Sequence, residues 1–446
     1  MLPYAYKKFV NQKVKNAFTL PPDFVTKRVE DELTLLEEES KNTHSNRTGN
    51  YWRGQYLLTS LLAKRVNKNA VISDYGSNGN MLISYLLGLS EIIPLPSFYY
   101  CPQCGHHELA PEAYISGYSL PPKWCPSCNA KLRGLGIDIP LNINSINISS
   151  SLGLRVSKIF LKKNHLDIAG SFKSKIQRRE HQSFSLIIGG ASVEFFESLE
   201  LSIIEKMVQE NHIDIIDIDY NDPHVFATIL GPNKFGLAII ATSLFERAYQ
   251  LTKKPLKNFD DLIRLMGFYL GPSSNIDKME TYAKNHHGLD LVRLPTNRDD
   301  ANTILLNYGI DNHHAGTIDN SVINKLIELT NGRENKEELL QLIDYLTITM
   351  YLERKSAVLV KTLLVYRLAY LKTYYQDIFV QAIDQLGYSK ASKIELKRAI
   401  ANVKLSSKNL GENISDKQLV KLVAHQFNGY VDFQEESIIM KIFSLK

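Results

Sequence analysis

The sequence of 446 residues predicts an α+β fold. Up to Pro223, short strand-like segments alternate with helical ones, and beyond that residue the pattern is mostly that of amphipathic helices. Two closely spaced pairs of cysteines interrupt the first part, which indicates an inserted metal-binding element. We therefore predict a mixed sheet with helices that carries a small cysteine-bearing element and is followed by a mostly helical domain.

The composition is that of an ordinary soluble protein, with 44% hydrophobic and 22% charged residues. The length suffices for two or three domains with cores of their own. Lys and Arg exceed Asp and Glu by 52 to 47, and this net charge of +5 permits a nucleic-acid partner without requiring one. No apolar run approaches the ~20 residues of a membrane span, and the first residues lack a signal-peptide core. We expect a cytoplasmic protein with no membrane partner.

The first half is predicted from apolar spacing and from strand-like alternation. Beyond Asp138, the polar positions of the strand-like stretch that ends at 153 are all Asn or Ser. In chain order, the predicted elements are helices over 20–41 and 51–69, a strand over 70–73, a glycine-containing turn and helix over 74–89, a strand within 136–153, and a mixed segment over 158–172.

The second half is predicted to be helical because apolar residues recur at three- and four-residue spacing. The predicted helices span 242–254, 258–270, 299–310, 335–355 and 356–387. The last of them is rich in aromatic residues, which could stack on bases but at helical spacing are expected mostly in the core. A tail over 388–446 is rich in lysine and is expected to be mainly helical.

Four cysteines, Cys101, Cys104, Cys125 and Cys128, form two C-x2-C pairs separated by 20 residues. Two such knuckles place four thiolates at the corners of a tetrahedron, which is the geometry that Zn²⁺ prefers. The alternative is two disulfides or four free thiols, and the lack of a secretion signal disfavours the disulfides. We predict one structural Zn²⁺ with all four positions filled by sulfur. His106 and His107 are the alternative to one of the cysteine ligands, but we expect them to lie in solvent.

This cysteine segment and its flanks resemble the PolC type of C-family replicative DNA polymerase. That family has a palm helix opened by a Gly/Ser turn, then a PLPxxYxCPxC zinc element, then a GxDIP segment that leads to the catalytic strand. The corresponding stretches here are DYGSNGNM (74–81), PLPSFYYCPQC (94–104), WCPSC (124–128) and GIDIP (136–140). The stretches that resemble the post-catalytic segment and the fingers are 157–171, 258–271, 296–310 and 354–375.

The resemblance covers roughly residues 18–390 and implies a degenerate C-family palm with an inserted zinc element, followed by a fingers-like domain. The chain begins inside the palm, so we expect no exonuclease, phosphatase-like or amino-terminal OB domain in it. The implied parts are a first palm-like part over 1–98, a zinc-binding element over 99–132, a second palm-like part over 133–222, a helical fingers-like domain over 223–390, and a Lys-rich tail over 391–446.

The resemblance places a catalytic Asp-x-Asp pair on the strand after GIDIP, where this chain has Asn142 and Asn144. The other register offers Ser145 and Asn147, and neither register contains an acid. Two Mg²⁺ ions need anionic oxygen ligands to offset their charge, and an amide oxygen is neutral. The resemblance therefore implies no catalytic residue at these degenerate positions, and we expect no catalytic Mg²⁺.

The resemblance also implies contacts to nucleotide or DNA. The candidates are Gly76, Ser77 and Gly79 in the turn and the cations Lys158, Arg298, Lys355, Arg367 and Lys372. The turn could instead be a plain helix N-terminus, and the cations could instead lie on solvated helix faces. The family pattern is lost at four further positions, which here are Tyr75, Leu270, Ser273 and Ala357.

We therefore expect a catalytically inactive polymerase relative that acts as a binding, regulatory or structural subunit in DNA replication, a mobile element, a phage or a defence system. Its expected partner is DNA, or a protein of replication or defence, and the oligomeric state stays open. The alternative is a DNA polymerase or another nucleotidyl-transfer enzyme with reassigned metal ligands, drawn from Asp214, Asp217 and Asp219. Asp217 and Asp219 would share one face of a strand, but an edge strand that runs into a loop explains that segment as well.

Overall fold

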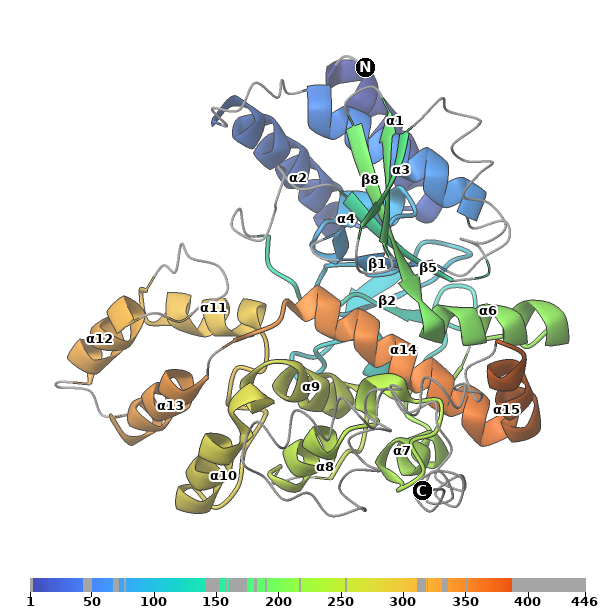
Figure 1. The fold of residues 1–446 in the computed structure, drawn as a ribbon. Coiled ribbons are helices and arrows are strands. Elements are labelled where there is room, and N and C mark those ends of the chain that lie inside the picture. The colour runs from blue at the N-terminus through green and yellow to red at the C-terminus, as the bar shows by residue number, and fades with distance from the viewer. Residues whose placement is uncertain are drawn as a thin grey trace. The chain divides into compact units, whose positions relative to one another are not determined.

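The α+β fold is confirmed in the computed structural model of the chain (Figure 1). The chain forms two compact units, one of Met1–Ser198 with Ala248–Thr362 and one of Leu199–Arg247 with Leu363–Lys446. The structure describes residues 3–42, 50–66, 72–75, 78–141, 152–157, 159, 175–179, 183–188, 191–215, 218–252, 255–310, 318, 320–330, 336–349 and 351–386.

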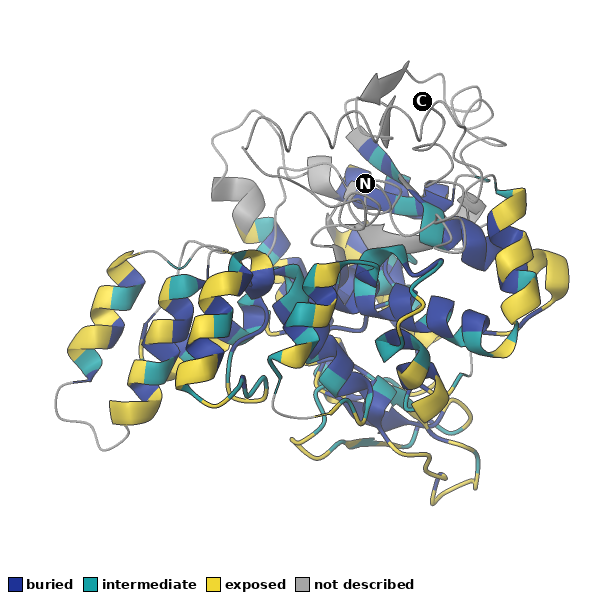
Figure 2. Cartoon of the chain, turned by 60° about the horizontal axis from the view of Figure 1, so that its bottom comes forward, coloured by how far each residue is buried: buried dark blue, intermediate teal, exposed yellow. Residues whose placement is uncertain are grey.

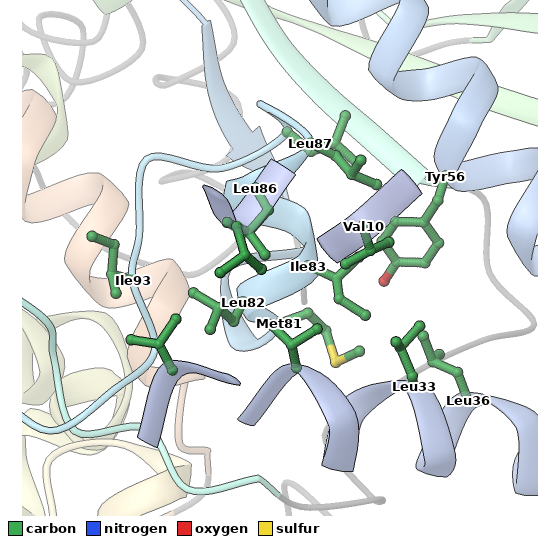
Figure 3. Close-up of a cluster of buried hydrophobic side chains, with 14 of the residues drawn as sticks. Val10, Leu33, Leu36, Tyr56, Met81, Leu82, Ile83, Leu86, Leu87 and Ile93 are labelled. Carbon is green, nitrogen blue, oxygen red and sulfur yellow. The ribbon is translucent and has the colours of Figure 1, made fainter. Parts of the chain in front are cut away.

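The first unit begins with three long helices and one short one. Figure 3 shows their apolar side chains meeting in a single cluster, to which Val10, Leu33 and Ile83 contribute. The two helices predicted near the N-terminus are confirmed, with ends that differ by three residues or fewer. The helices are α1 (Pro3–Ala17), α2 (Asp23–Asn42), α3 (Asn50–Val66) and α4 (Leu82–Leu86).

A mixed five-stranded sheet completes this core, as the sequence predicted. Its order is β1-β5-β8-β7-β6, and only the β5–β8 pair is parallel. Leu154 and Val156 of β5 and Val193 and Phe195 of β8 alternate into the helical core, as the two-residue period of a strand requires. The strands are β1 (Ile72–Tyr75), β5 (Leu152–Ser157), β6 (Lys175–Arg179), β7 (Ser183–Ile188) and β8 (Ala191–Ser198).

The strand-like stretch 136–153 is only partly described. Residues 136–141 contain no strand beyond an isolated bridge at Ile137, and β5 begins at Leu152. Positions 142–151, which carry the amides in place of the expected carboxylates, lie outside the described residues. The mixed segment 158–172 lies outside them as well, apart from Ile159.

The cysteine pairs are carried by a separate three-stranded antiparallel sheet of order β3-β2-β4. Its strands are short, and the loop between the two pairs contains the 3-10 helix η2 (Gly117–Ser119). Gly117 has no room for a side chain, because a Cβ there would lie 2.4 Å from the backbone nitrogen of Leu135. The strands are β2 (Phe98–Tyr100), β3 (His107–Leu109) and β4 (Arg133–Leu135).

The rest of the first unit is helical and has its own core, which includes Phe268, Leu305, Leu326 and Tyr345. Figure 2 shows the buried and exposed stripes along such helices, in agreement with the predicted amphipathic pattern. The helices are α9 (Phe259–Leu270), α10 (Ile276–Asn285), α11 (Arg298–Asn307), α12 (Asn320–Leu329) and α13 (Lys336–Ile348), with the first part of α14 (Lys355–Tyr374). The short helix α8 (Ser243–Gln250) precedes them and is divided between the units, since its residues up to Arg247 belong to the second unit.

The predicted helix 335–355 is shorter than expected. It ends at Ile348, and residues 351–354 are not helical before α14 begins at Lys355. The next helix begins with a tertiary cap, because the Asp299 carboxylate accepts a hydrogen bond of 2.8 Å from the backbone N–H of Lys355. A carboxylate at this place satisfies an amide that has no partner inside the helix and starts a new helix there.

The second unit contains α6 (Leu199–Asn211), α7 (Pro223–Leu230), the later part of α14 and α15 (Gln376–Gln385). The helical stretch predicted over 356–387 consists of two helices, since the chain leaves the helical path at Tyr375. Its aromatic residues divide between core and surface: Tyr366 is fully buried, whereas Tyr374 is 47% exposed.

The expected strand within 213–222 is wrong for the residues that the structure describes. Ile213–Ile215 and Ile218–Asp222 are not in a strand. The Asp219 carboxylate accepts from the N–H of Asn221, and the Asp222 carboxylate accepts from the N–H of His224 at the start of α7. Local hydrogen bonds of this kind favour turns and helix caps over a strand.

Asp260, near the start of α9, joins the helical part of the first unit to the cysteine-bearing sheet. Its carboxylate accepts from Ser116 Oγ at 2.5 Å and from the N–H of Ile115 at 2.9 Å, and its own N–H donates to Ser119 Oγ at 2.8 Å. Burial raises the pKa of Asp260, and the hydrogen bonds to the two serines oppose that rise. Only 2% of Asp260 is exposed, so water cannot take the place of its carboxylate as the acceptor for the Ser116 hydroxyl and the Ile115 N–H.

We expect the substitution Asp260→Ala to lower the free energy of unfolding by about 3 kcal/mol, because it leaves buried donors without an acceptor. Chemical denaturation measures this change. Asp260→Asn retains one acceptor oxygen and should cost clearly less. Glu337→Ala, at an exposed position of α13, is the matched control and should cost almost nothing. Equal stability of Asp260→Ala and Glu337→Ala would contradict the role given to this contact.

Candidate metal centre and cation cluster

Each cysteine pair lies in a tight knuckle with the same backbone geometry. The N–H of Gly105 donates to the carbonyl of Cys101, and the N–H of Asn129 donates to the carbonyl of Cys125, both at 2.9 Å. Gly105 and Asn129 have φ angles of 76° and 57°, a region that glycine and asparagine enter most readily. The residue after the second cysteine of each pair therefore allows the chain to fold back so that both sulfurs point inward.

The four sulfur atoms converge on one point. Cys101 Sγ lies 3.4 Å from Cys128 Sγ, Cys104 Sγ lies 3.5 Å from Cys125 Sγ, and all four lie within 4.8 Å of one another. These separations are too long for disulfide bonds and suit four ligands about 2.3 Å from a shared ion. The cluster is therefore able to hold one metal ion, and the predicted ligand set is confirmed as a spatial cluster.

The alternative metal ligands do not form a comparable cluster in the described part of the chain. There, the four cysteines are the only group of three or more His, Cys, Asp or Glu side chains placed to share an ion. Asp214 and Asp219 are exposed and join no such group, and Asp217 lies outside the described residues.

The turn expected to contact phosphate is described only at Gly79, because Gly76 and Ser77 lie outside the described residues. The helix that follows it, α4, is already capped by the fully buried carboxylate of Glu32, which accepts from the N–H groups of Leu82 and Ile83 at 2.7 and 2.9 Å. A phosphate would have to displace this carboxylate to reach those two amides.

Glu32 is held by Arg28, four residues earlier on α2, through a contact of 2.7 Å. Burial raises the pKa of Glu32, and the Arg28 charge works against that rise. The Arg28 guanidinium also donates to the carbonyls of Asn80 and Ile139, each at 3.0 Å. This pair ties the glycine turn to the segment that leads into Asn142, and the only sequence signal for it is the i, i+4 spacing of an Arg and a Glu.

Lys355 is not the solvated cation that helix periodicity alone suggests. It is 4% exposed, and its Nζ pairs with Asp300 at 2.9 Å. Burial lowers the pKa of Lys355, but the nearby Asp300 carboxylate outweighs that effect and leaves it raised. Lys355 thus remains charged, and its ammonium group is already paired with the Asp300 carboxylate.

Arg298 and Arg354 form the main part of a cation cluster next to Lys355. The backbone N–H of Arg298 donates to the carbonyl of Glu353 at 2.8 Å, and the side-chain Nε of Arg298 is buried without a hydrogen-bond partner. Burial lowers the pKa of Arg354, and the charge of Arg298 lowers it further. The carboxylates near Arg354 are Asp299, which has the larger effect on its pKa, and Glu353, which is shared with Lys361 at 3.3 Å. Two guanidinium groups held close together in a partly buried place favour an anion.

The two cations of the second unit differ from each other. Lys372 is 8% exposed, and its Nζ donates to Asn233 O and Phe235 O, both at 2.8 Å, and to Asn233 Oδ1 at 3.0 Å. Three acceptors satisfy an ammonium group fully, so Lys372 has no donor left for a phosphate. Arg367 is half-buried and donates from Nε to the hydroxyl of Tyr220 at 3.3 Å. The remaining predicted cation, Lys158, lies outside the described residues.

Among the helices that the structure describes, none is both long and apolar enough to cross a bilayer.

Comparison with known proteins finds relatives for part of the chain. Residues 200–310 match the family model of the bacterial DNA polymerase III alpha subunit finger domain. PolC-type DNA polymerase III of Thermotoga petrophila and that of Thermotoga maritima are each 31% identical over 170 residues, which is 38% of this chain. The polC-type enzyme of Streptococcus pyogenes is 33% identical over 121 residues, or 27% of this chain.

The matched parts make up only 11% of the Thermotoga enzymes and 8% of the Streptococcus enzyme. The chain therefore spans a small fraction of the curated relatives that it matches.

Proposed function

We propose that this chain, which is a partial relative of PolC-type DNA polymerase III, binds DNA or nucleotide phosphate and does not itself transfer nucleotides. Its role would be that of a binding, regulatory or structural subunit in DNA replication, a mobile element, a phage or a defence system. The observation that supports binding is the pair Arg298 and Arg354, which lie in two of the stretches that resemble the family's fingers, 296–310 and 354–375. The lack of carboxylates at Asn142 and Asn144 carries the inactive part.

The proposed ligand follows from charge and geometry. Guanidinium groups bind phosphate through paired N–H donors, and two of them together suit an oxygen-rich anion better than a single lysine does. The buried Nε of Arg298 lacks a partner, so a bound phosphate would satisfy a donor that the protein itself leaves open. Lys355 and Lys372 support the scaffold in this proposal, because each is already bound to protein oxygens.

Zn²⁺ is the proposed metal of the cysteine site. Four thiolates and no oxygen or open position are typical of structural zinc, and the family that the chain resembles carries zinc at this place. The site would stabilise the β2-β3-β4 sheet and would take no part in chemistry.

The proposed parts keep the predicted order of palm-like, zinc-binding, palm-like and fingers-like segments. The finger-domain match begins at residue 200, before the predicted boundary at 223. We accordingly assign α6 to the fingers-like part of the chain in this proposal.

The binding proposal predicts a change in salt dependence. The double substitution Arg298→Ala with Arg354→Ala should lower the slope of log affinity against log salt for duplex primed DNA by about 1.8, because each lost phosphate contact removes about 0.9. Fluorescence anisotropy at a series of salt concentrations measures the slope. A slope that is the same in the parent and the double variant would refute the assignment.

The control for charge alone is Lys278→Ala with Lys284→Ala, which removes two exposed cations from α10. This control should leave the slope close to that of the parent. If the parent shows no binding to primed DNA at low salt, the DNA-binding role fails, and a role through a protein partner remains as the competing explanation.

A further inference from the structure

The outer side of the second cysteine knuckle carries an exposed tryptophan. Trp124, next to Cys125, is 62% exposed, although large aromatic side chains are usually buried. It faces Lys131 in an antiparallel bridge, and the N–H of Leu132 donates to the carbonyl of Lys123 at 2.8 Å. The indole is therefore held on a short, hydrogen-bonded ribbon.

Strand alternation places two cations on the same face of this ribbon as Trp124, and the charge of one of them, Arg133, also acts on Tyr85, where it opposes the rise in pKa that burial causes. Lys131 is its direct cross-strand neighbour, and Arg133 follows two residues later, so both side chains point to the same side. The burial pattern agrees, since Lys131 and Arg133 are exposed and Leu132 between them is buried. Neither cation forms an ion pair with a carboxylate that the structure describes.

The surroundings of this surface are free of acidic residues in sequence. No Asp or Glu occurs between Glu112 and Asp138, whereas three cations do. The third of them, Lys123, pairs with Glu108 and lies 5.2 Å from the ring centroid of Tyr99. The positive charge of the surface therefore comes from Lys131 and Arg133.

We infer that Trp124, Lys131 and Arg133 form a binding surface for single-stranded DNA. An indole face stacks on any base, and the flanking cations would pair with the phosphates on either side of that base. Single strands are favoured over duplex DNA because only an unpaired base can offer its face to an exposed ring. This site uses other residues than Arg298 and Arg354, so it goes beyond the phosphate-binding role proposed above.

The test uses the natural fluorescence of the site. The chain has two tryptophans, and Trp52→Phe leaves Trp124 as the only reporter. Titration of this full-length variant with a 15-residue oligo-dT should quench its emission and saturate. An equal concentration of a blunt duplex of the same length should quench much less. The absence of quenching by oligo-dT, or equal quenching by the duplex, would overturn the inference.

Substitutions then separate stacking from charge. Anisotropy of labelled oligo-dT should show Trp124→Ala to bind about tenfold more weakly, with Trp124→Phe close to the parent. Lys131→Ala with Arg133→Ala should lower the salt slope by about 1.4, whereas the α10 control pair should not. This measurement keeps Trp52, so it does not depend on whether the Trp52→Phe variant folds. An affinity of Trp124→Ala for oligo-dT equal to that of the parent would overturn the inference.

Two control measurements test whether weaker binding comes from damage to the metal site or from the Arg298 and Arg354 site. Each variant should still bind one metal ion per chain, which shows that the knuckle is intact. The Arg298→Ala and Arg354→Ala pair, placed in the Trp52→Phe chain, should leave the quenching of Trp124 unchanged. If that pair abolished the quenching, the tryptophan site would not be independent and the inference would fail, while the phosphate-binding proposal would stand.

Discussion

Replacing Cys125 with serine will abolish the binding of one metal ion per chain and will unfold the surrounding sheet. A serine hydroxyl stays protonated at neutral pH and cannot replace a thiolate, and three remaining sulfurs leave the ion exposed to water. Because small metal sites gain most of their folding free energy from the ion, the loss should be local and large. Elemental analysis under reducing conditions measures the metal, and hydrogen exchange measures the unfolding over residues 98–135.

The unfolding should spread along one defined route. The loop between the two cysteine pairs holds Ser116 and Ser119, and both are bound to Asp260 on α9. We therefore expect Cys125→Ser to raise exchange at the start of α9 as well, and to leave α15 as protected as in the parent. Ser127→Ala, an exposed position inside the same knuckle, is the matched control and should retain the metal. Parent protein that contains no metal while its thiols are free would show that the site is not a metal centre.

The metal centre could be predicted from the sequence because the residues that form each knuckle are close together in the chain. Both knuckles are short, each repeats the same turn, and the turn residues Gly105 and Asn129 suit the positive φ that the fold requires. Long amphipathic helices such as α2 and α9 were predictable for the same reason, since a helical face depends on residues within a few turns.

The elements that could not be predicted depend on residues far away in the chain. The sequence predicts a helix up to residue 355, but α13 ends at Ile348 and residues 351–354 are not helical. The start of α14 lies within one residue of the predicted one, and the carboxylate that caps it is Asp299, 56 residues earlier. The segment 213–222 alternates like a strand, yet Tyr366 donates from its hydroxyl to the carbonyl of Asp219, 147 residues away. Apolar alternation reports only which side chains are buried, and a loop packed on a helix can satisfy the same pattern.

The same limit applies to the candidate site. Lys355 and Lys372 were candidates for nucleic-acid contacts with a solvated helix face as the alternative, and both are buried because their acceptors are Asp300 and Asn233. The role of Glu32 could not be predicted for a similar reason, since its N–H partners on α4 are 50 and 51 residues away. Periodicity gives the face of a helix, but the partner of a charge is known only from the tertiary structure.

The chain will not extend a primer with Mg²⁺ or Mn²⁺ at any dNTP concentration. Phosphoryl transfer of this kind depends on positioning and charge, and the metals supply most of both. Losing one stabilising group commonly costs about 10²–10³ in rate, so the absence of both carboxylates at 142 and 144 should remove activity below detection. Extension of a labelled primer on a template measures this, with a PolC-type enzyme as the positive control.

Restoring acids tests whether these two positions are the only defect. We expect Asn142→Asp with Asn144→Asp to remain inactive. By the resemblance to PolC-type enzymes, Tyr75 and Ala357 also depart from the family pattern, so we expect weak binding of the triphosphate as well. Asn285→Asp with Asn320→Asp adds the same charge at exposed positions and is the matched control. Synthesis restored in the first pair and absent in the second would show that the scaffold is intact and only its metal ligands are missing. Template-directed synthesis by the unmodified chain, lost when Asp217 and Asp219 become alanine, would instead establish an enzyme with reassigned ligands.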